Sequence, residues 1–221
     1  MTDTDSSTLP QPTVFIVDDD AAVLNAFSRL LRVSGYAVRT FLSAQSLLEQ
    51  DITDLPGCLV LDVAMPGLNG LELQQALIAT HGDRPTIFVS GASDVPISVQ
   101  AMKLGAVDFL TKPVDDEVLL SAIRVAIGKD QQRRGARTEL KVFLDRFATL
   151  TQREREVLQQ VVVGRLNKQI AADLGIVEKT IKVHRHRMME KMQVASLADL
   201  VRMTERAQAG GWVATKVSLR C

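Results

Sequence analysis

The stretch Cys58-Leu59-Val60-Leu61-Asp62 is a short apolar run that ends on a carboxylate. Three further apolar runs in the first half of the chain also stop on reactive groups: residues 14–17 before Asp18-Asp19-Asp20, 86–89 before Ser90, and 107–111 before Lys112-Pro113. Short apolar runs that alternate with amphipathic stretches are typical of parallel strands joined by crossover helices. In such a sheet the carboxyl ends of the strands lie along one edge, where ligands bind. The carboxylates, the hydroxyl and the ammonium are therefore expected to converge on one site.

The spacing of apolar residues predicts a doubly wound domain in the first half of the chain. Strands are expected to end at Val17, Phe41, Asp62, Ser90 and Thr111. Helices are expected over 21–34, from the Ser43 cap, over 68–80, after Gly91-Ala92-Ser93-Asp94 as far as Leu104, and over 115–127. This alternation predicts an α/β, flavodoxin-like domain with five parallel strands in the order 2-1-3-4-5. Asp20 and Asp115, each just before a helix, are interpreted as N-caps.

Carboxylates at the ends of the first and third strands suit a divalent cation. Asp18, Asp19 and Asp62 would repel one another unless a cation neutralised them, and ligand sets made of oxygen favour Mg²⁺ or Mn²⁺. A carboxylate beside such an ion can attack phosphorus and form an aspartyl phosphate. Lys112 would then offer a point charge to the phosphoryl oxygens, and Ser90 a hydroxyl donor.

Charge is divided unevenly between the halves of the chain. Residues 1–128 hold 7 lysines and arginines against 16 aspartates and glutamates, and residues 129–221 hold 19 against 10. The formal net charges of the halves are thus −9 and +9. A basic half favours a polyanion such as double-stranded DNA, although opposite charges could also simply hold the two halves together.

Composition predicts a cytoplasmic protein that does not enter a membrane. Hydrophobic residues make up 46% of the chain and charged residues 24%, and the sequence has no run of about 18 apolar residues that could span a bilayer. The polar N-terminus has no signal-peptide core. The two cysteines, Cys58 and Cys221, suggest no disulfide framework.

The second half is predicted to be helical. Thr151 with Glu154 predicts a capping box at the start of a helix that Gly164 closes. Helices over 167–174 and 178–192, joined by the turn Gly175-Ile176-Val177, form a helix-turn-helix pattern. Ser196 with Asp199 opens a fourth helix of this domain.

These patterns divide the chain into five parts. They are a disordered N-terminus (1–12), an α/β domain (13–128), a partly helical linker (129–143), an all-α helix-turn-helix domain (144–209, motif 167–186) and a C-terminal tail (210–221). Glycine and a charged, glutamine-rich composition over 128–137 are the basis for the linker.

The second helix of the helix-turn-helix pattern has two distinct faces. Its apolar stripe consists of Ile181, Met188 and Met192, and the other face presents Lys179, Lys182, Val183 and His186. A cationic and small apolar face on this helix suits the major groove of DNA. His184 and His186 stand at i, i+2 and point to different faces, so we do not expect them to bind a metal.

The set Asp18-Asp19, Asp62 with Met65-Pro66-Gly67, Ser90-Gly91 and Lys112-Pro113 resembles the receiver domain of bacterial two-component response regulators. The resemblance covers residues 13–128. It implies that Asp62 is the phosphoacceptor, that Asp19 and Asp62 bind Mg²⁺ with the Ala64 carbonyl, and that Asp18 holds a metal-bound water.

The same resemblance assigns the parts that would respond to phosphate. Ser90 and Phe109 take the switch positions and Lys112 the phosphate-sensing position. The Lys112–Pro113 bond is expected to be cis, because the family's Lys-Pro bond is.

Residues 150–158, 167–171 and 180–184 closely resemble the LuxR-type helix-turn-helix, so the whole chain resembles a NarL/FixJ-type regulator, nearer the FixJ branch. By position, the resemblance implies base contacts from Lys182, Val183 and His186, and phosphate contacts from Lys168, Thr180 and Arg185. Val177 departs from the pattern, because the family usually has a serine or threonine cap there, and this leaves the roles of Glu178 and Lys179 open.

The function predicted from these features is a phosphorylation-dependent transcription factor, an activator rather than a dedicated enzyme. Its expected partners are a histidine kinase, double-stranded DNA, RNA polymerase and a second copy of the chain after phosphorylation. One alternative is a haloacid-dehalogenase-like phosphatase, in which Asp18-Asp19-Asp20, Ser90, Lys112 and Asp115-Asp116 would form the site. A receiver that only relays phosphate or binds a protein is another.

Overall fold

The computed structural model describes residues 11–81, 83–91 and 95–213, which form two compact units that divide between Gln132 and Arg133. Most of the predicted N-terminal segment (1–12) and residues 214–221 of the predicted tail lie outside the described residues, as do Ala92, Ser93 and Asp94. Within the described ranges, no helix is long and apolar enough to cross a membrane.

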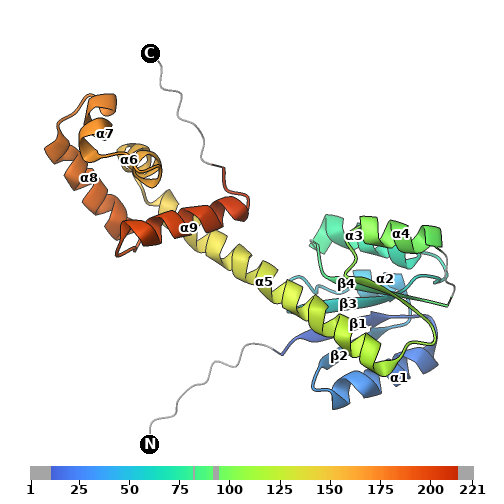
Figure 1. The fold of residues 1–221 in the computed structure, drawn as a ribbon. Coiled ribbons are helices and arrows are strands. Elements are labelled where there is room, and N and C mark those ends of the chain that lie inside the picture. Colours follow the sequence, from blue (N-terminus) through green and yellow to red (C-terminus); the bar gives the residue numbers. More distant parts are fainter. Residues whose placement is uncertain (1–10, 82, 92–94, 214–221) are drawn as a thin grey trace, which may run out of the picture. The chain divides into compact units, whose positions relative to one another are not determined.

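The first unit alternates strands and helices, as the sequence predicts (Figure 1). Its elements are β1 (Thr13–Val17), α1 (Ala21–Val33), β2 (Ala37–Phe41), α2 (Ala44–Leu48), β3 (Gly57–Asp62), α3 (Gly70–His81), β4 (Thr86–Ser90), α4 (Val95–Lys103), β5 (Asp108–Thr111) and the start of α5 (Asp116–Ala148). The strands pair in parallel in the order β2-β1-β3-β4-β5, which confirms the predicted flavodoxin-like fold.

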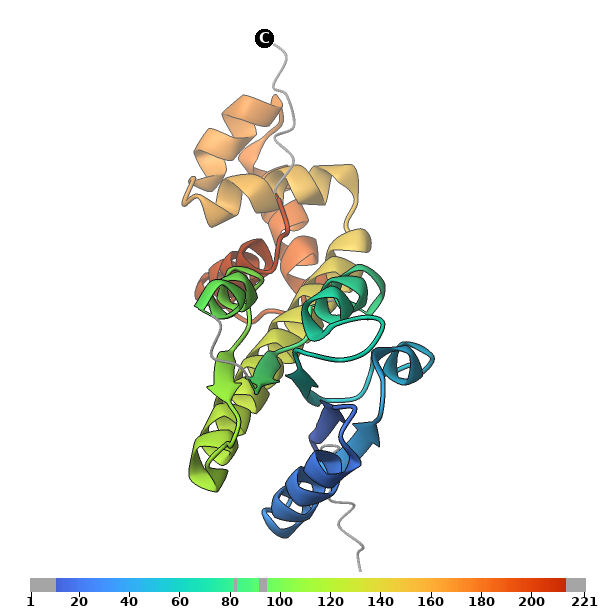
Figure 2. The same ribbon diagram turned by 90° about the vertical axis from the view of Figure 1, so that its right-hand side faces the viewer.

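Helices cover both faces of the sheet (Figures 1 and 2). On one face, side chains such as Phe15, Leu59 and Phe88 pack under α2, α3 and α4. On the other face, Ile16 and Val60 pack under α1 and the first part of α5. Because successive strand residues point to opposite faces, a strand covered on both sides must be apolar throughout, and β1 and β4 are buried along their whole length.

The second unit is helical. Its elements are the last part of α5, then α6 (Gln152–Val162), α7 (Asn167–Leu174), α8 (Glu178–Lys191) and α9 (Leu197–Ala209). The capping box of Thr151 with Glu154 and the Ser196 N-cap are present as predicted. Gly175 ends α7 in the left-handed region, with φ of 65°, where glycine avoids the steric cost that other residues meet. The tight turn into α8 follows.

The structure differs from the sequence prediction between residues 129 and 143. We expected a helix that ends near Ile127 and a linker after it, but α5 continues without a break to Ala148. Gly128 and Gly135 both lie inside the helix. The helix tolerates them because a glycine costs it only about 1 kcal/mol relative to alanine. The surrounding glutamines, arginines and alanines are good helix formers and no proline interrupts them, so composition alone was a poor guide to a linker here.

The domain limits drawn at residues 143 and 210 also change. Phe143, inside the partly helical linker, is fully buried in the core of the second unit, and the i, i+3, i+4, i+7 spacing of Leu140, Phe143, Leu144 and Phe147 does predict a helix that packs there. Trp212, placed in the tail, stacks edge-on against Phe143 and Phe147 with ring centroids 4.7 Å and 5.5 Å apart. The described start of the predicted tail therefore belongs to the second domain.

Gly57, the first residue of β3, gives a test of how closely the sheet packs. Its φ is +142°, and a Cβ there would lie 1.8 Å from the carbonyl oxygen of Thr13. We predict that Gly57→Ala lowers the free energy of unfolding of the first unit by more than about 3 kcal/mol, because backbone strain and a backbone clash coincide.

Gly35→Ala is the matched control, because Gly35 also has a positive φ of +88° but nothing lies within 4 Å of its would-be Cβ. It should cost only about 1 kcal/mol. Urea unfolding followed by far-ultraviolet circular dichroism measures both variants, and the fluorescence of Trp212, the sole tryptophan, reports the second unit separately. Equal losses in the two variants would contradict the prediction.

Candidate functional site

Three charged side chains meet at the carboxyl edge of the sheet. The register pairs Val17 of β1 with Leu61 of β3, so Asp18 and Asp62, the next residues along the two strands, come side by side. Ser90 of β4 pairs with Thr111 of β5, which sets Lys112 beside the same edge. The predicted convergence of these strand ends is confirmed for Asp18, Asp62 and Lys112.

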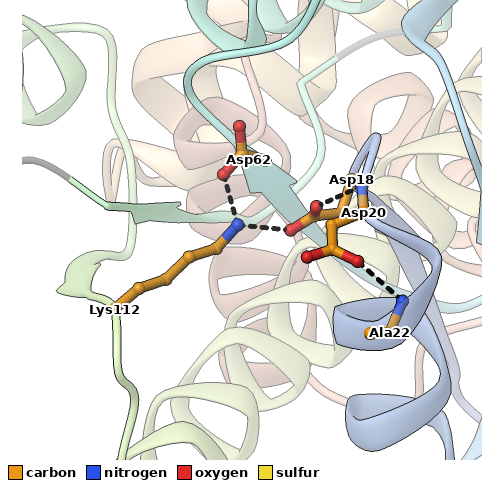
Figure 3. Close-up of polar contacts among 5 residues, drawn as sticks. All are labelled: Asp18, Asp20, Ala22, Asp62 and Lys112. Atoms are coloured by element: carbon orange, nitrogen blue, oxygen red, sulfur yellow. Dashed lines mark hydrogen bonds and ion pairs between the residues drawn. The ribbon is translucent and has the colours of Figure 1, made fainter.

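Lys112 bridges the two carboxylates (Figure 3). Its Nζ donates to Asp18 Oδ2 and to Asp62 Oδ1, both at 2.7 Å. The side chains of Asp18 and Asp62 are only 3% and 5% exposed, whereas that of Lys112 is 25% exposed. Burial on its own lowers the pKa of Lys112, but the hydrogen bonds to the two aspartates outweigh it and raise the pKa above its ordinary value. The ammonium therefore stays charged, and two buried carboxylates share a single positive charge.

Asp19 does not join this group. Asp19 is exposed, and among the residues that the structure describes no three acidic, histidine or cysteine side chains are arranged to hold a metal ion. A third carboxylate beside Asp18 and Asp62 would add repulsion that one ammonium does not offset. The predicted metal ligands thus divide into two buried carboxylates and an exposed one.

The neighbouring acids have local structural roles. Asp20 caps α1 by accepting the backbone N–H of Ala22 at 2.8 Å, and Asp115 accepts the N–H of Glu117 at 2.9 Å at the start of α5 (Figure 3 shows the first). Both interpretations as N-caps are confirmed. Asp18 also accepts the backbone N–H of Asp20 at 2.9 Å, a contact that fixes its carboxylate and that the sequence did not predict.

The remaining predicted residues lie close to this edge in the sequence and the sheet. Ser90 is buried at the end of β4, and its carbonyl accepts the backbone N–H of Lys112 at 2.7 Å. Phe109 is partly buried against the core under α4, and Ala64 is exposed after β3. The Lys112–Pro113 bond is cis, as expected.

An apolar groove beside the site was not predicted. It is lined by Phe27, Leu30 and Val33 of α1, and by Lys112, Pro113 and Val114 of the β5–α5 connection. Val33 is 90% exposed. Helical spacing showed only that these α1 residues are apolar, and only the structure shows that part of that face is left open next to Lys112.

In the second unit, α8 has the two predicted faces. Ile181, Met188 and Met192 are fully buried, while Lys179, Lys182, Val183 and His186 are exposed. Val177 stands at the N-cap of α8 and makes no side-chain hydrogen bond there. This is what the replacement of the family's usual serine or threonine by valine implied. The exposed face of α8 thus presents lysines together with the small apolar side chain of Val183.

Several of the residues predicted to contact DNA already have partners. Lys182 lies 3.3 Å from Glu178 and His186 lies 3.5 Å from Glu190, both one turn away on α8. Arg185 donates to Asn167 Oδ1 at 3.1 Å. The exposed Lys182–Glu178 pair contributes roughly 0.3–0.5 kcal/mol, so a phosphate or a base edge can replace Glu178 at little cost.

Two family models match this chain: the response regulator receiver domain over residues 14–124 and the LuxR family of bacterial regulatory proteins over residues 148–204. This chain belongs to the NarL/FixJ-type response regulators. It regulates transcription in a two-component system, through a receiver domain and a LuxR-type DNA-binding domain.

Relatives over nearly the whole length agree. The response regulator is 46% identical to the response regulator protein TodT of Pseudomonas putida over 193 residues, 87% of this chain and 85% of TodT. It is 45% identical to the transcriptional regulatory protein FixJ of Azorhizobium caulinodans over 193 residues, and this match covers 86% of this chain and 90% of FixJ. The solved structure of response regulator StyR matches with a TM-score of 0.79 and 45% identity, over 89% of this chain and 99% of that one.

A buried acid in the DNA-binding unit of the regulator gives a pH test. Burial on its own raises the pKa of Glu154, but hydrogen bonds from Lys191 and from Thr151 outweigh it and lower the pKa below its ordinary value. Because the folded-state pKa is depressed, Glu154 adds stability above the unfolded pKa of about 4.3, and this is lost as the pH falls through the folded-state value.

We predict that Glu154→Gln makes the second unit less stable at pH 7 and less sensitive to acid. Urea unfolding followed by Trp212 fluorescence at pH 7 and at acid pH measures this difference. An unchanged pH dependence in the variant would show that the Glu154 carboxylate is not the titrating group.

Proposed function

We propose that Asp62 accepts a phosphoryl group from the phosphohistidine of a partner histidine kinase. The observation that carries this proposal is the buried Asp62 carboxylate at the carboxyl edge of the sheet, 2.7 Å from Lys112 Nζ. A carboxylate oxygen of Asp62 attacks phosphorus, the phosphorus–nitrogen bond breaks, and the imidazole leaves as its neutral form after taking a proton. Lys112 then pairs with the phosphoryl oxygens.

The oxygen donors at this edge fit a divalent cation. Asp18 and Asp62 together carry two negative charges against one ammonium, and such oxygen ligands suit Mg²⁺ or Mn²⁺. We assign Asp19, Asp62 and the Ala64 carbonyl to direct binding and Asp18 to a metal-bound water. When bound, the ion neutralises charge on the phosphoryl oxygens.

The apolar groove beside Lys112 supports a protein as the phosphoryl donor. A helical partner that packs on Phe27, Leu30 and Val33 would bring its own reactive side chain to the mouth of the site. The regulator accepts the phosphate and loses it slowly, and is not a dedicated enzyme. Asp115, an acid that the phosphatase alternative would need at the reaction centre, instead caps α5.

Phosphorylation changes the surface of the receiver in this proposal. A phosphate on Asp62 draws the Ser90 hydroxyl toward it, and Phe109 turns into the space that opens. The surface formed by α4, β5 and α5 then pairs with that of a second copy. It already exposes large apolar side chains, namely Val95, Val99, Met102, Val118 and Val125.

The dimer would bring two LuxR-type domains to a two-fold DNA site and activate transcription by contacting RNA polymerase. A regulator of this kind works where the DNA is, and we therefore place it in the cytoplasm. In each domain Lys182, Val183 and His186 contact bases, Lys168, Thr180 and Arg185 contact phosphates, and Lys179 extends the same exposed face.

The phosphoacceptor role predicts the behaviour of Asp62→Asn. With a small-molecule phosphodonor and Mg²⁺, the unaltered chain should bind its DNA site at least tenfold more tightly than without the donor, a gain of about 1.4 kcal/mol. Asp62→Asn should lose this gain, and titration of a labelled duplex measures it. Asp20→Asn is the matched control, because asparagine caps a helix as well as aspartate does. Donor-stimulated binding that survives in Asp62→Asn would overturn the proposal.

Removing a base contact and removing a phosphate contact should impair DNA binding in two different ways. Lys182→Ala should relax sequence choice at one base position, because each good base contact contributes about 1–3 kcal/mol of discrimination. Lys168→Ala should weaken binding to all sequences alike and flatten the dependence of log affinity on log salt by about one unit. Binding measured at several salt concentrations on matched and mismatched duplexes separates them. The same loss in both variants would contradict the assignment.

A further inference from the structure

Two other helices hold the carboxyl end of the recognition helix α8. Glu154 of α6 is 2% exposed, and its Oε2 accepts from Lys191 Nζ at 2.6 Å. The same oxygen also accepts the backbone N–H of Thr151 at 2.8 Å, so the capping box of α6 fixes its place. Arg146, in the last turn of α5, donates from its guanidinium to the carbonyl of Met192 at 3.0 Å.

At this end of α8, Arg146 bonds a backbone carbonyl beyond those that accept from the following turn. The carbonyls of Met188, Met189 and Glu190 accept the N–H groups of Met192, Val194 and Gln193. Gln193 turns the chain with φ of 53°, the one non-glycine residue with positive φ among those described. The carbonyl of the capping residue Met192 takes the guanidinium, and a cation is favourable there because the carboxyl end of a helix is its negative end.

The opposite end of α8 is not held in this way. Val177 makes no side-chain cap, and Glu178 and Lys179 are exposed, so this end is held by the apolar contacts of the buried Ile181 instead. The helix has 14 residues and is therefore about 21 Å long. A tilt of about 5° about the held end moves Lys182, which lies about 13.5 Å along the helix from Lys191, by about 1.2 Å, which is enough to break base hydrogen bonds that tolerate only a few tenths of an ångström.

We propose that Arg146 and Glu154 are positioning residues of the DNA interface, which fix the direction of α8 and thereby its discrimination between DNA sequences. The inference rests on the proposed role of α8 in reading DNA. Neither side chain needs to touch DNA for this role. The two contacts come from α5 and α6, so the carboxyl end of α8 is held from two directions.

The test compares specific with non-specific binding of the full-length chain. The specific probe is a duplex that the unaltered chain selects from a random pool, and the non-specific probe is a scrambled duplex of equal length. Arg146→Met keeps the length of the side chain and removes the donor, and Arg146→Lys restores a donor. Glu154→Gln keeps the shape and removes the charge, and Glu156→Gln is its matched control, because Glu156 pairs with Arg153 on α6 itself.

Arg146→Met and Glu154→Gln should each weaken binding to the selected duplex about tenfold, the effect of losing one charge-assisted hydrogen bond. Binding to the scrambled duplex should change less than about twofold, and the salt dependence should stay the same because no phosphate contact is lost. Arg146→Lys and Glu156→Gln should behave like the unaltered chain. Trp212 fluorescence at the assay temperature checks that the second unit remains folded.

Two results would overturn the positioning role. One is equal loss on both duplexes, which would mean that these residues only stabilise the fold. The other is unchanged discrimination in Arg146→Met and Glu154→Gln. If the unaltered chain selects no duplex at all, the proposed DNA-binding function itself fails, and the positioning role falls with it.

Discussion

The ammonium of Lys112, shared between Asp18 and Asp62 at 2.7 Å from each, is the contact on which the receiver depends. Two carboxylates with almost no access to water would repel each other strongly without a cation between them. Their positions follow from the sheet, because parallel strands in the order β2-β1-β3-β4-β5 bring the ends of β1, β3 and β5 to one edge. A phosphoryl group on Asp62 would change the charge that Lys112 faces, and any response of the chain must begin with this redistribution.

The sequence was sufficient to predict those features that depend on local pattern. Fully buried strands such as β1 read as apolar runs, and the caps at Asp20, Ser43 and Thr151 are side chains whose partners lie two or three residues away. The contact of Lys112 with Asp18 spans 94 residues, yet it followed from strand order, since each group stands directly after a strand. What failed was the helix end expected near Ile127, because Gly128 and Gly135 cost less than the helix-forming residues around them contribute, although the two units do divide inside the predicted linker.

Other features depend on distant pairings that no periodicity reports. Trp212 completes the core around Phe143, and Arg146 reaches the carbonyl of Met192, 46 residues away. The exposure of Asp19 next to the buried Asp18 is likewise a property of side-chain direction, not of residue type. In the second unit two charged side chains hold the carboxyl end of the recognition helix, whereas its amino end has no side-chain cap.

The most direct measurement of the central claim is to identify the aspartate that becomes phosphorylated. The chain is treated with a small-molecule phosphodonor in the presence of Mg²⁺, digested, and its peptides are analysed by mass spectrometry. We expect a phosphoryl group on Asp62, at the end of β3. A phosphoryl group on Asp18, at the end of β1, would contradict it and would favour the phosphatase alternative instead.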